Sequence, residues 1–239
     1  DLRGRTSDLP IMIIDSLGQS LQGTGSVSLT PMNVIIFDID KATGRSAIEE
    51  GKIDYLGRGG ARDRGSSSSN LPKPNMAFEM WGPSGTDLDD DADVSVLGMQ
   101  PDSDYVFYAA TSYDPVQIHN QYAFELSNQV GQWAPDYRHI ELFSNMRWQR
   151  NRNELNTVGP EDYFGVYAVM EKISRGSHRV DVASIDPSVT KTPEEAAPGE
   201  PNISGGYIWK VDRGDPGEAA FSAGGGSFNW VYPKSPKSN

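Results

Sequence analysis

The residues best suited to binding a phosphate occur together in one Gly/Ser-rich stretch. They are Arg64, Ser66, Ser67, Ser68 and Lys73. Small residues let the backbone approach an anion, hydroxyl and N–H groups donate hydrogen bonds, and an arginine adds a bidentate charge. A lysine can then reach the phosphate as a point charge. The pattern predicts a phosphate cradle, and the alternative is a surface loop that only carries exposed arginines.

A second candidate is the run of carboxylates within residues 82–93. Its alternating members are Asp87, Asp89 and Asp91. A calcium loop presents its oxygen ligands with this spacing, but the run lacks the central glycine and terminal glutamate of an EF-hand. A solvated acidic turn is the favoured interpretation, because charge runs are usually solvated. Calcium stays open as a ligand of these three aspartates.

Other polar residues carry weaker signals. Asn120 lies at the start of a predicted helix, where it could touch substrate or metal. Polar residues in a first turn more often cap the helix or face solvent. The three histidines share no i, i+4 spacing, so a histidine metal site is not expected. The chain has no cysteine, which excludes a thiol nucleophile, a disulfide scaffold and a cysteine zinc site.

The segments that must position these residues are mostly strands. Apolar and alternating runs predict strands at residues 9–15, 34–38, 76–81, 105–109, 140–143, 164–170 and 206–212. Residues 57–70 have low complexity and separate two of these strands.

One helix is predicted after the strand at 105–109. Asp114-Pro115 supplies its start and Gly131 its end. Its i, i+4 apolar residues are Ile118, Tyr122, Leu126 and Val130. We expect this stripe to face the core, as the apolar face of an amphipathic helix does.

The sum of these elements predicts an α+β fold with a mostly antiparallel mixed sheet and few helices. A loose segment over residues 1–8 is expected to precede one domain over 9–215. Residues 216–239 form a Gly/Pro/Ser-rich tail. A chain of 239 residues is long enough for one large domain with an appendage.

The charge balance excludes some partners. The chain has 21 Lys and Arg against 33 Asp and Glu, a net charge of −12. That charge repels a phosphate backbone and no basic stripe compensates, so nucleic acid is not an expected partner. Apolar runs such as residues 11–14 are far shorter than the ~18 residues of a transmembrane helix.

Taken in order, several short segments resemble the CotH kinase family, the atypical kinases of the spore-coat type. The segments include Arg64-Gly65-Ser66-Ser67-Ser68, Ile118-His119-Asn120, Glu141-Leu142-Phe143, Tyr163-Phe164-Gly165-Val166-Tyr167 and Gly205-Gly206-Tyr207-Ile208. Each piece is short, but their shared order across about residues 55–215 makes the resemblance specific.

The resemblance implies a diverged protein-kinase-like N-terminal lobe that binds ATP and Mg²⁺. Arg64, the three serines, Lys73 and Arg138 would then contact the nucleotide, and Asn120 would act in catalysis. Glu171 would pair with Lys73, as kinases use such an ion pair to position the nucleotide. The alternative is that Glu171 and Lys172 are solvated residues after a strand. The family acts on coat or surface proteins. We therefore expect an exported protein at the cell surface or outside the cell, with a protein substrate or assembly partner.

Three departures from the family pattern weaken the kinase expectation. His119 stands where the family has an arginine, and Pro74 replaces a second lysine after Lys73. The acidic motif expected to hold the metal lies in a later half of the family, so the chain is expected to be a first lobe that is inactive by itself. The alternative is a non-catalytic structural or adhesive component of an extracellular or surface assembly. Calcium-dependent surface binding is a third possibility.

Overall fold

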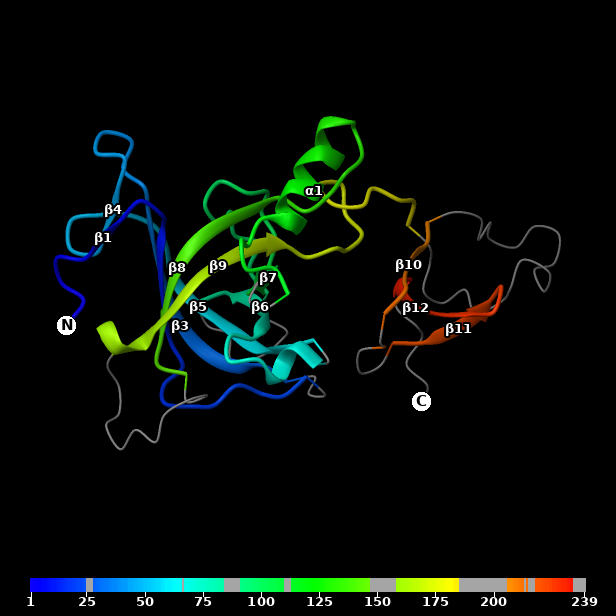
Figure 1. The fold of residues 1–239 in the computed structure, drawn as a ribbon, viewed down its shortest axis with the longest axis horizontal. Coiled ribbons are helices and arrows are strands. Elements are labelled where there is room, and N and C mark those ends of the chain that lie inside the picture. Colours follow the sequence, from blue (N-terminus) through cyan, green and yellow to red (C-terminus); the bar gives the residue numbers. More distant parts are fainter. Residues whose placement is uncertain are drawn as a thin grey trace. The chain divides into compact units, whose positions relative to one another are not determined.

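The structure, a computed structural model, divides into two units, Asp1–Lys172 and Ile173–Asn239. Figure 1 labels helix α1 and most of their strands. The residues that the structure describes are 1–24, 28–65, 67–83, 91–109, 113–146, 158–184, 206–212, 214 and 218–233.

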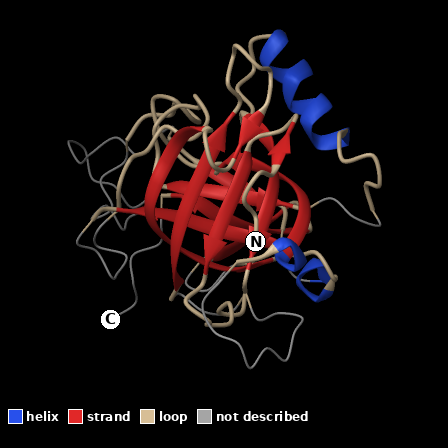
Figure 2. Ribbon diagram, turned by 90° about the vertical axis from the view of Figure 1, so that its left-hand side faces the viewer, coloured by secondary structure: helices blue, strands red, loops and turns tan. Residues whose placement is uncertain are grey.

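A closed barrel of seven strands forms the first unit (Figure 2). Around the barrel the order is β2 (Ile11–Asp15), β3 (Thr30–Asp38), β5 (Lys52–Arg64), β6 (Asn75–Trp81), β7 (Asp104–Tyr108), β9 (Tyr163–Glu171) and β8 (Tyr137–Ser144). Neighbouring strands are antiparallel except β2 and β8, whose parallel pairing closes the barrel. The described residues of this unit also form β1 (Thr6–Ser7), β4 (Ser46–Ala47), α1 (His119–Gln129) and the 3-10 turns η1 (Ser67–Asn70) and η3 (Pro160–Asp162).

The expectation of an α+β fold with a kinase-like N-terminal lobe is wrong. The chain is mostly β, and its main sheet closes on itself. Closure pairs Ile11 with Glu141 and Ile14 with Ser144, residues far apart in the sequence. Local apolar patterns indicate where strands occur, but the partner of a strand depends on which distant faces bury each other.

Strand β5 occupies the segment that reads as low-complexity sequence. Its glycines admit aromatic rings from β6. A Cβ atom at Gly59 would lie 2.7 Å from the Phe78 ring, and one at Gly60 would lie 2.3 Å from the Trp81 ring. Close approach of a neighbouring group is a recognised reason for glycine inside a strand. This glycine-rich segment forms the longest strand of the barrel.

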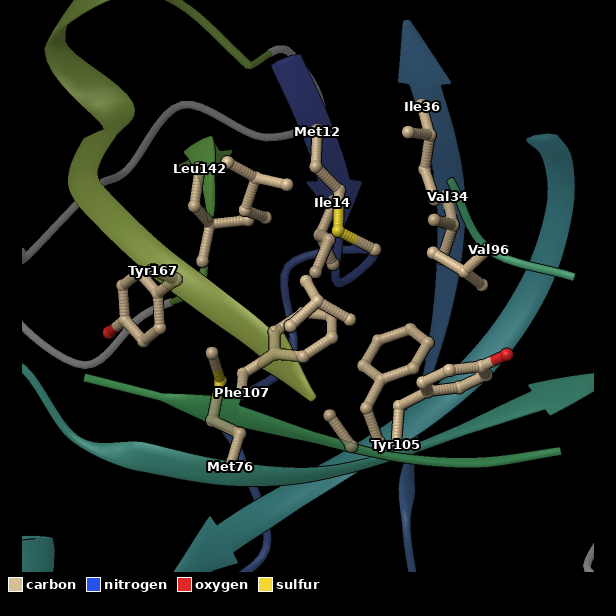
Figure 3. Close-up of a cluster of buried hydrophobic side chains, with 14 of the residues drawn as sticks. Met12, Ile14, Val34, Ile36, Met76, Val96, Tyr105, Phe107, Leu142 and Tyr167 are labelled. Atoms are coloured by element: carbon tan, nitrogen blue, oxygen red, sulfur yellow. The ribbon is translucent and has the colours of Figure 1, made fainter. Parts of the chain in front are cut away.

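Side chains fill the interior of the barrel. Figure 3 shows the cluster that includes Met12, Ile14, Val34, Ile36, Met76, Val96, Tyr105, Phe107, Leu142 and Tyr167. The rings of Phe78 and Phe107 stack with their centroids 4.7 Å apart. Because interior positions of a small barrel are filled in this way, the strand ends and connections must carry any chemistry.

Helix α1 lies against the outside of the barrel, but not through its apolar stripe. The stripe residues and their exposed fractions are Ile118 (53%), Tyr122 (62%), Leu126 (44%) and Val130 (74%). The expectation that they face the core is wrong. Gln121 is buried instead, and Phe124 packs with Val106, Ala168 and Met170 of β7 and β9. Helical spacing identifies an apolar stripe, but it does not say which surface that stripe contacts.

The observed ends of α1 agree only in part with the ends predicted from the sequence. The helix begins at His119 rather than beside Pro115, although the Asp114 carboxylate still accepts the His119 N–H at 3.1 Å. It ends at Gln129, close to Gly131, which has φ +79°. A glycine with positive φ ends a helix without steric cost, as predicted.

The second unit contains a three-stranded antiparallel sheet. Its order is β10 (Ile208–Lys210), β12 (Gly226–Tyr232) and β11 (Ala220–Ala223). Phe221 stacks on Trp230 at 4.4 Å and on Phe228 at 5.2 Å, between ring centroids. In the described part of the chain, no helix is both long and apolar enough to span a membrane.

Candidate functional site

The predicted phosphate cradle lies in the connection between β5 and β6. Arg64 ends β5 and is opposite Asn75, the first residue of β6. Lys73 lies in the same connection, so the structure brings the predicted arginine and lysine onto one hairpin. Ser66 and the side chain of Ser67 lie outside the described part of the chain.

The turn that follows Arg64 depends on a glycine. Gly65 has φ +104°, and a Cβ atom there would lie 2.2 Å from the Ser68 hydroxyl oxygen. An L-residue is disfavoured at such a φ. The backbone carbonyl of Ser68 accepts the Leu71 N–H at 3.2 Å, within the turn η1. Gly65 therefore shapes the start of the connection that carries the serines.

Lys73 is half-buried against β9, with uncharged partners. Its ammonium group donates to the carbonyl oxygen of Val166 and lies 3.5 Å from the Gln117 amide oxygen. It also lies 4.6 Å from the centroid of the Tyr167 ring, in cation–π contact. No carboxylate of the described chain forms an ion pair with Lys73. Within the described residues, its positive charge therefore has only uncharged partners.

Burial changes the protonation of this lysine. It lowers the pKa of Lys73 to about 8, because a charged ammonium group loses hydration inside the protein. The lysine thus remains mostly protonated at pH 7 and becomes neutral a little above that. An anion bound beside it would favour the charged form and raise the pKa again.

Two further groups with shifted pKa values are Tyr167, which contacts this lysine, and the part-buried Asp63 of β5. The Tyr167 hydroxyl donates to the carbonyl oxygen of Pro74 at 3.1 Å, and burial raises its pKa. Burial also raises the pKa of Asp63 to about 6. The Oδ1 atom of Asp63 is buried and accepts no hydrogen bond within the described structure. The nearby charges of Tyr113 and Asp63 add to the rise in the pKa of Tyr167.

Sequence reasoning missed Asp63, Tyr167 and Gln117. Asp63 is hidden between two arginines in β5, and Tyr167 looks like one more apolar residue of β9. Gln117 adopts φ +56° in the turn before α1, which no local pattern indicates. Only the tertiary contacts bring Gln117 and Tyr167 to Lys73.

Glu171 lies away from Lys73, toward the other end of β9. Its carboxylate accepts the Asp136 N–H at 3.0 Å, and the residue is opposite Tyr105 of β7. Five residues separate Glu171 from Val166, which corresponds to roughly 16 Å of extended strand. The structure therefore does not bring Glu171 and Lys73 together as an ion pair.

Arg138 also lies at the end of the barrel that carries Glu171. Its guanidinium group pairs with the Asp136 carboxylate at 2.7 Å and donates to the carbonyl oxygen of Leu97 at 3.2 Å. Its charge is thus matched by a neighbouring acid. A nucleotide-binding role for Arg138 stays a prediction.

An acidic group occupies the same end. Glu79 is buried and accepts the Trp81 indole N–H at 2.7 Å. Burial raises the pKa of Glu79 to about 7, against the effect of that hydrogen bond, and the charges of Asp91 and Asp104 add to the rise. Asp104 in turn pairs with Lys172 at 2.7 Å.

The predicted calcium ligands are only partly described. Asp91 is exposed and bridges to Trp81 by backbone pairing, whereas Asp87 and Asp89 lie outside the described residues. Across the described ranges, no three His, Asp or Glu side chains are grouped so that they could hold a metal ion. Calcium binding stays a prediction.

Asn120 is exposed in the first turn of α1. Burial, followed by the Tyr113 charge, raises the pKa of Tyr108 to about 12, and a hydrogen bond with Asn120 opposes that rise. The described contacts thus link Asn120 to Tyr108. A catalytic role for Asn120 stays a prediction.

The comparisons identify the class of protein that carries this site. Residues 61–222 match the family described as CotH kinase protein, about two thirds of the 239-residue chain. The chain therefore belongs to the CotH kinase protein family, and the resemblance is confirmed. The match begins within β5 and includes the β5–β6 connection, α1 and Glu171. Comparisons with curated proteins and with solved structures gave no match.

Proposed function

We propose that this CotH-family protein binds the phosphates of ATP at the β5–β6 connection and serves protein phosphorylation at a coat or cell surface. The observation that supports this proposal is the half-buried Lys73, whose partners among the described residues are all uncharged. A cation held without a counter-ion favours an anionic ligand, and a lysine at a phosphate acts as a point charge.

The neighbours of Lys73 fit a phosphate ligand. Arg64 is exposed at the end of β5, on the same hairpin, and η1 follows it. In the transfer, the bond from the γ-phosphorus to its bridging oxygen breaks, ADP leaves, and a target hydroxyl takes the phosphoryl group and loses its proton. Protein groups contribute mainly by positioning and by electrostatic stabilisation. Mg²⁺ accompanies ATP in this proposal, and no described residue is assigned to hold it.

Calorimetry with MgATP tests the proposal. The wild-type chain should bind MgATP, and Lys73→Met, which keeps the length but removes the charge, should lose at least about tenfold in affinity. Lys172→Met is the matched control, because it removes a lysine that pairs with Asp104. It should leave the affinity unchanged. A wild-type chain without heat of binding, or a Lys73→Met chain that binds equally well, contradicts the proposal.

A structural or adhesive role in a surface assembly is the second candidate. It is favoured by the aromatic residues of the sheet β10–β12–β11, where Trp209 is 52% exposed and its ring lies 4.9 Å from Phe228. Exposed Trp and Tyr side chains are enriched in protein interfaces. This role predicts no MgATP binding by the wild-type chain, so the same calorimetry separates the two candidates.

A further inference from the structure

The turn before α1 brings one uncharged side chain to Lys73. Gln117 lies two residues before the helix, and its Oε1 atom is 3.5 Å from the Lys73 Nζ atom. An ammonium group has donors and no acceptor, so the amide atom that faces it is the oxygen. In the described part of the chain, the Nε2 atom of Gln117 donates no hydrogen bond and is accessible to solvent.

Hydrogen bonds fix the backbone of Gln117 on both sides of the residue. Its N–H donates to the carbonyl oxygen of Asp114 at 3.0 Å, and its own carbonyl oxygen lies 3.2 Å from His139 Nε2 on β8. Because a carbonyl oxygen can only accept, His139 is the donor of that hydrogen bond. The buried Asp114 carboxylate also accepts the His119 N–H. The turn is thus attached to β8 and to the start of α1.

The backbone conformation fixed in this way is a strained one. Gln117 has φ +56°, in the left-handed region that residues other than glycine seldom adopt. Among the described residues that are not glycine, only Leu17 and Leu97 also have a positive φ. Strain of this kind persists where the surrounding structure holds it, and it clusters at ligand-binding sites. A glycine would remove the strain, but it would also remove the amide that contacts Lys73.

An amide is suited to contact a lysine and a phosphate at the same time. Its oxygen accepts from the ammonium group, and its NH₂ group donates to an anion. A carboxylate in this position would have no donor and would neutralise Lys73, and a second lysine would have no acceptor. Because the two side chains are in contact, a phosphate that reaches the Lys73 ammonium group is also within reach of the Gln117 amide.

We propose that Gln117 is the second phosphate-binding side chain of the Lys73 site, where Oε1 orients the ammonium group and Nε2 donates to the bound phosphate. The turn before α1 thereby joins the β5–β6 connection in one site. The assignment of the ligand as a nucleotide rests on the proposed function. Lys73 and Gln117 themselves recognise phosphate oxygens and no nucleoside group, so a polyphosphate without a nucleoside is also a ligand of this pair.

Calorimetry with MgATP and with tripolyphosphate tests the role of Gln117. Gln117→Gly removes the amide, so its affinity for both probes should fall at least about fivefold. Its melting temperature should not fall, because glycine adopts the left-handed conformation without strain. Leu17→Gly is the matched control, since Leu17 has φ +53°, is 49% exposed and is not among the contacts of Lys73. It should bind both probes as tightly as the wild-type chain.

Gln117→Glu is the second variant. It keeps the size of the side chain but places a carboxylate beside Lys73, so it should weaken binding of both probes more than Gln117→Gly does. Unchanged affinity in either variant, or a lower melting temperature together with the affinity loss of Gln117→Gly, overturns the role of Gln117 and leaves the proposed function standing.

The two probes separate this role from the proposed function. A wild-type chain that binds tripolyphosphate but not MgATP overturns the proposed function, and a loss of tripolyphosphate affinity in Gln117→Gly then still supports the role of Gln117. A wild-type chain that binds neither probe overturns both.

Discussion

Lys73 lies just before strand β6, and Glu79 lies within that strand. Burial shifts their pKa values in opposite directions. The pKa of Lys73, just before β6, is lowered to about 8, whereas the pKa of Glu79, toward the end of β6, is raised to about 7. Burial is the largest cause of both shifts, because it disfavours whichever form is charged. One barrel thus holds a base and an acid that both change charge near neutral pH.

The two regions differ in how their charges are matched. At the Glu79 end, Lys172 pairs with Asp104 and Arg138 pairs with Asp136. At the Lys73 end, the lysine contacts a carbonyl oxygen, an amide oxygen and a ring. In the described part of the chain, the cations near Glu79 thus have protein counter-ions, whereas Lys73 has only uncharged partners.

The largest expected effect comes from removing the cover of Glu79. Trp81→Ala should destabilise the protein by about 3–5 kcal/mol, because Trp81 is 3% exposed and its loss leaves a cavity. It also removes the indole N–H that Glu79 accepts. Urea unfolding measures the change, and Trp81→Phe, which keeps a ring, should lose less. A loss below about 1 kcal/mol for Trp81→Ala would contradict the packing described.

The titration of Glu79 should make the protein less stable as the pH rises. The folded state binds more protons than the unfolded state between the ordinary pKa of 4.5 and about 7. Stability should therefore fall as pH rises through this window, by on the order of 1–2 kcal/mol. Glu79→Gln, which cannot ionise, should abolish that fall. Denaturant unfolding at several pH values measures it, and equal slopes in both proteins would argue against the buried acid.

The titration of Lys73 should have the opposite effect and make the protein more stable as the pH rises, in a higher pH range. Between about 8 and 10.5 the unfolded state binds more protons, so stability should rise with pH in that window. Partial exposure of the lysine reduces the effect to on the order of 1 kcal/mol. Lys73→Met should remove the rise, and Lys172→Met is the control that should keep it. If Lys73→Met retained the full rise, another group would be its source.

The smallest expected effect concerns the turn at the Lys73 end. Gly65→Ala should cost about 1 kcal/mol or slightly more, because φ is +104° and Ser68 must move. Gly98→Ala is the matched control, since Gly98 has φ +76° but open space around it. Thermal melting compares the two. A larger loss for Gly98→Ala would show that the Ser68 contact does not constrain the turn.

Much of the local structure could be predicted from sequence. Apolar runs located β2, β3, β6, β7, β8, β9 and β10 within a few residues, and Gly131 marked the end of α1. The ordered CotH segments identified the family, which the match over residues 61–222 confirms. They also placed Arg64 and Lys73 in one connection. These features depend on neighbours in the sequence, so residue type and spacing are enough to indicate them.

Contacts between distant segments were decided only by the tertiary structure. The pairing of β2 with β8 closes the barrel, and the rings of Phe78 and Trp81 explain why glycine-rich β5 is a strand. The side of α1 that is buried depends on what the outer face of β7 and β9 offers, and it proved to be the side of Gln121 and Phe124. The partners of Lys73 come from β9 and from the turn before α1.

The sequence by itself determined which residues carry charge, which segments form strands, and which family the chain belongs to. The tertiary structure decided which charges are buried and which are paired. The physical reason is that hydration and ion pairing depend on every segment that surrounds a side chain. Lys73 illustrates both parts: its position beside a Gly/Ser-rich turn is visible in the sequence, but its lowered pKa and its uncharged partners arise only when β9 packs against it.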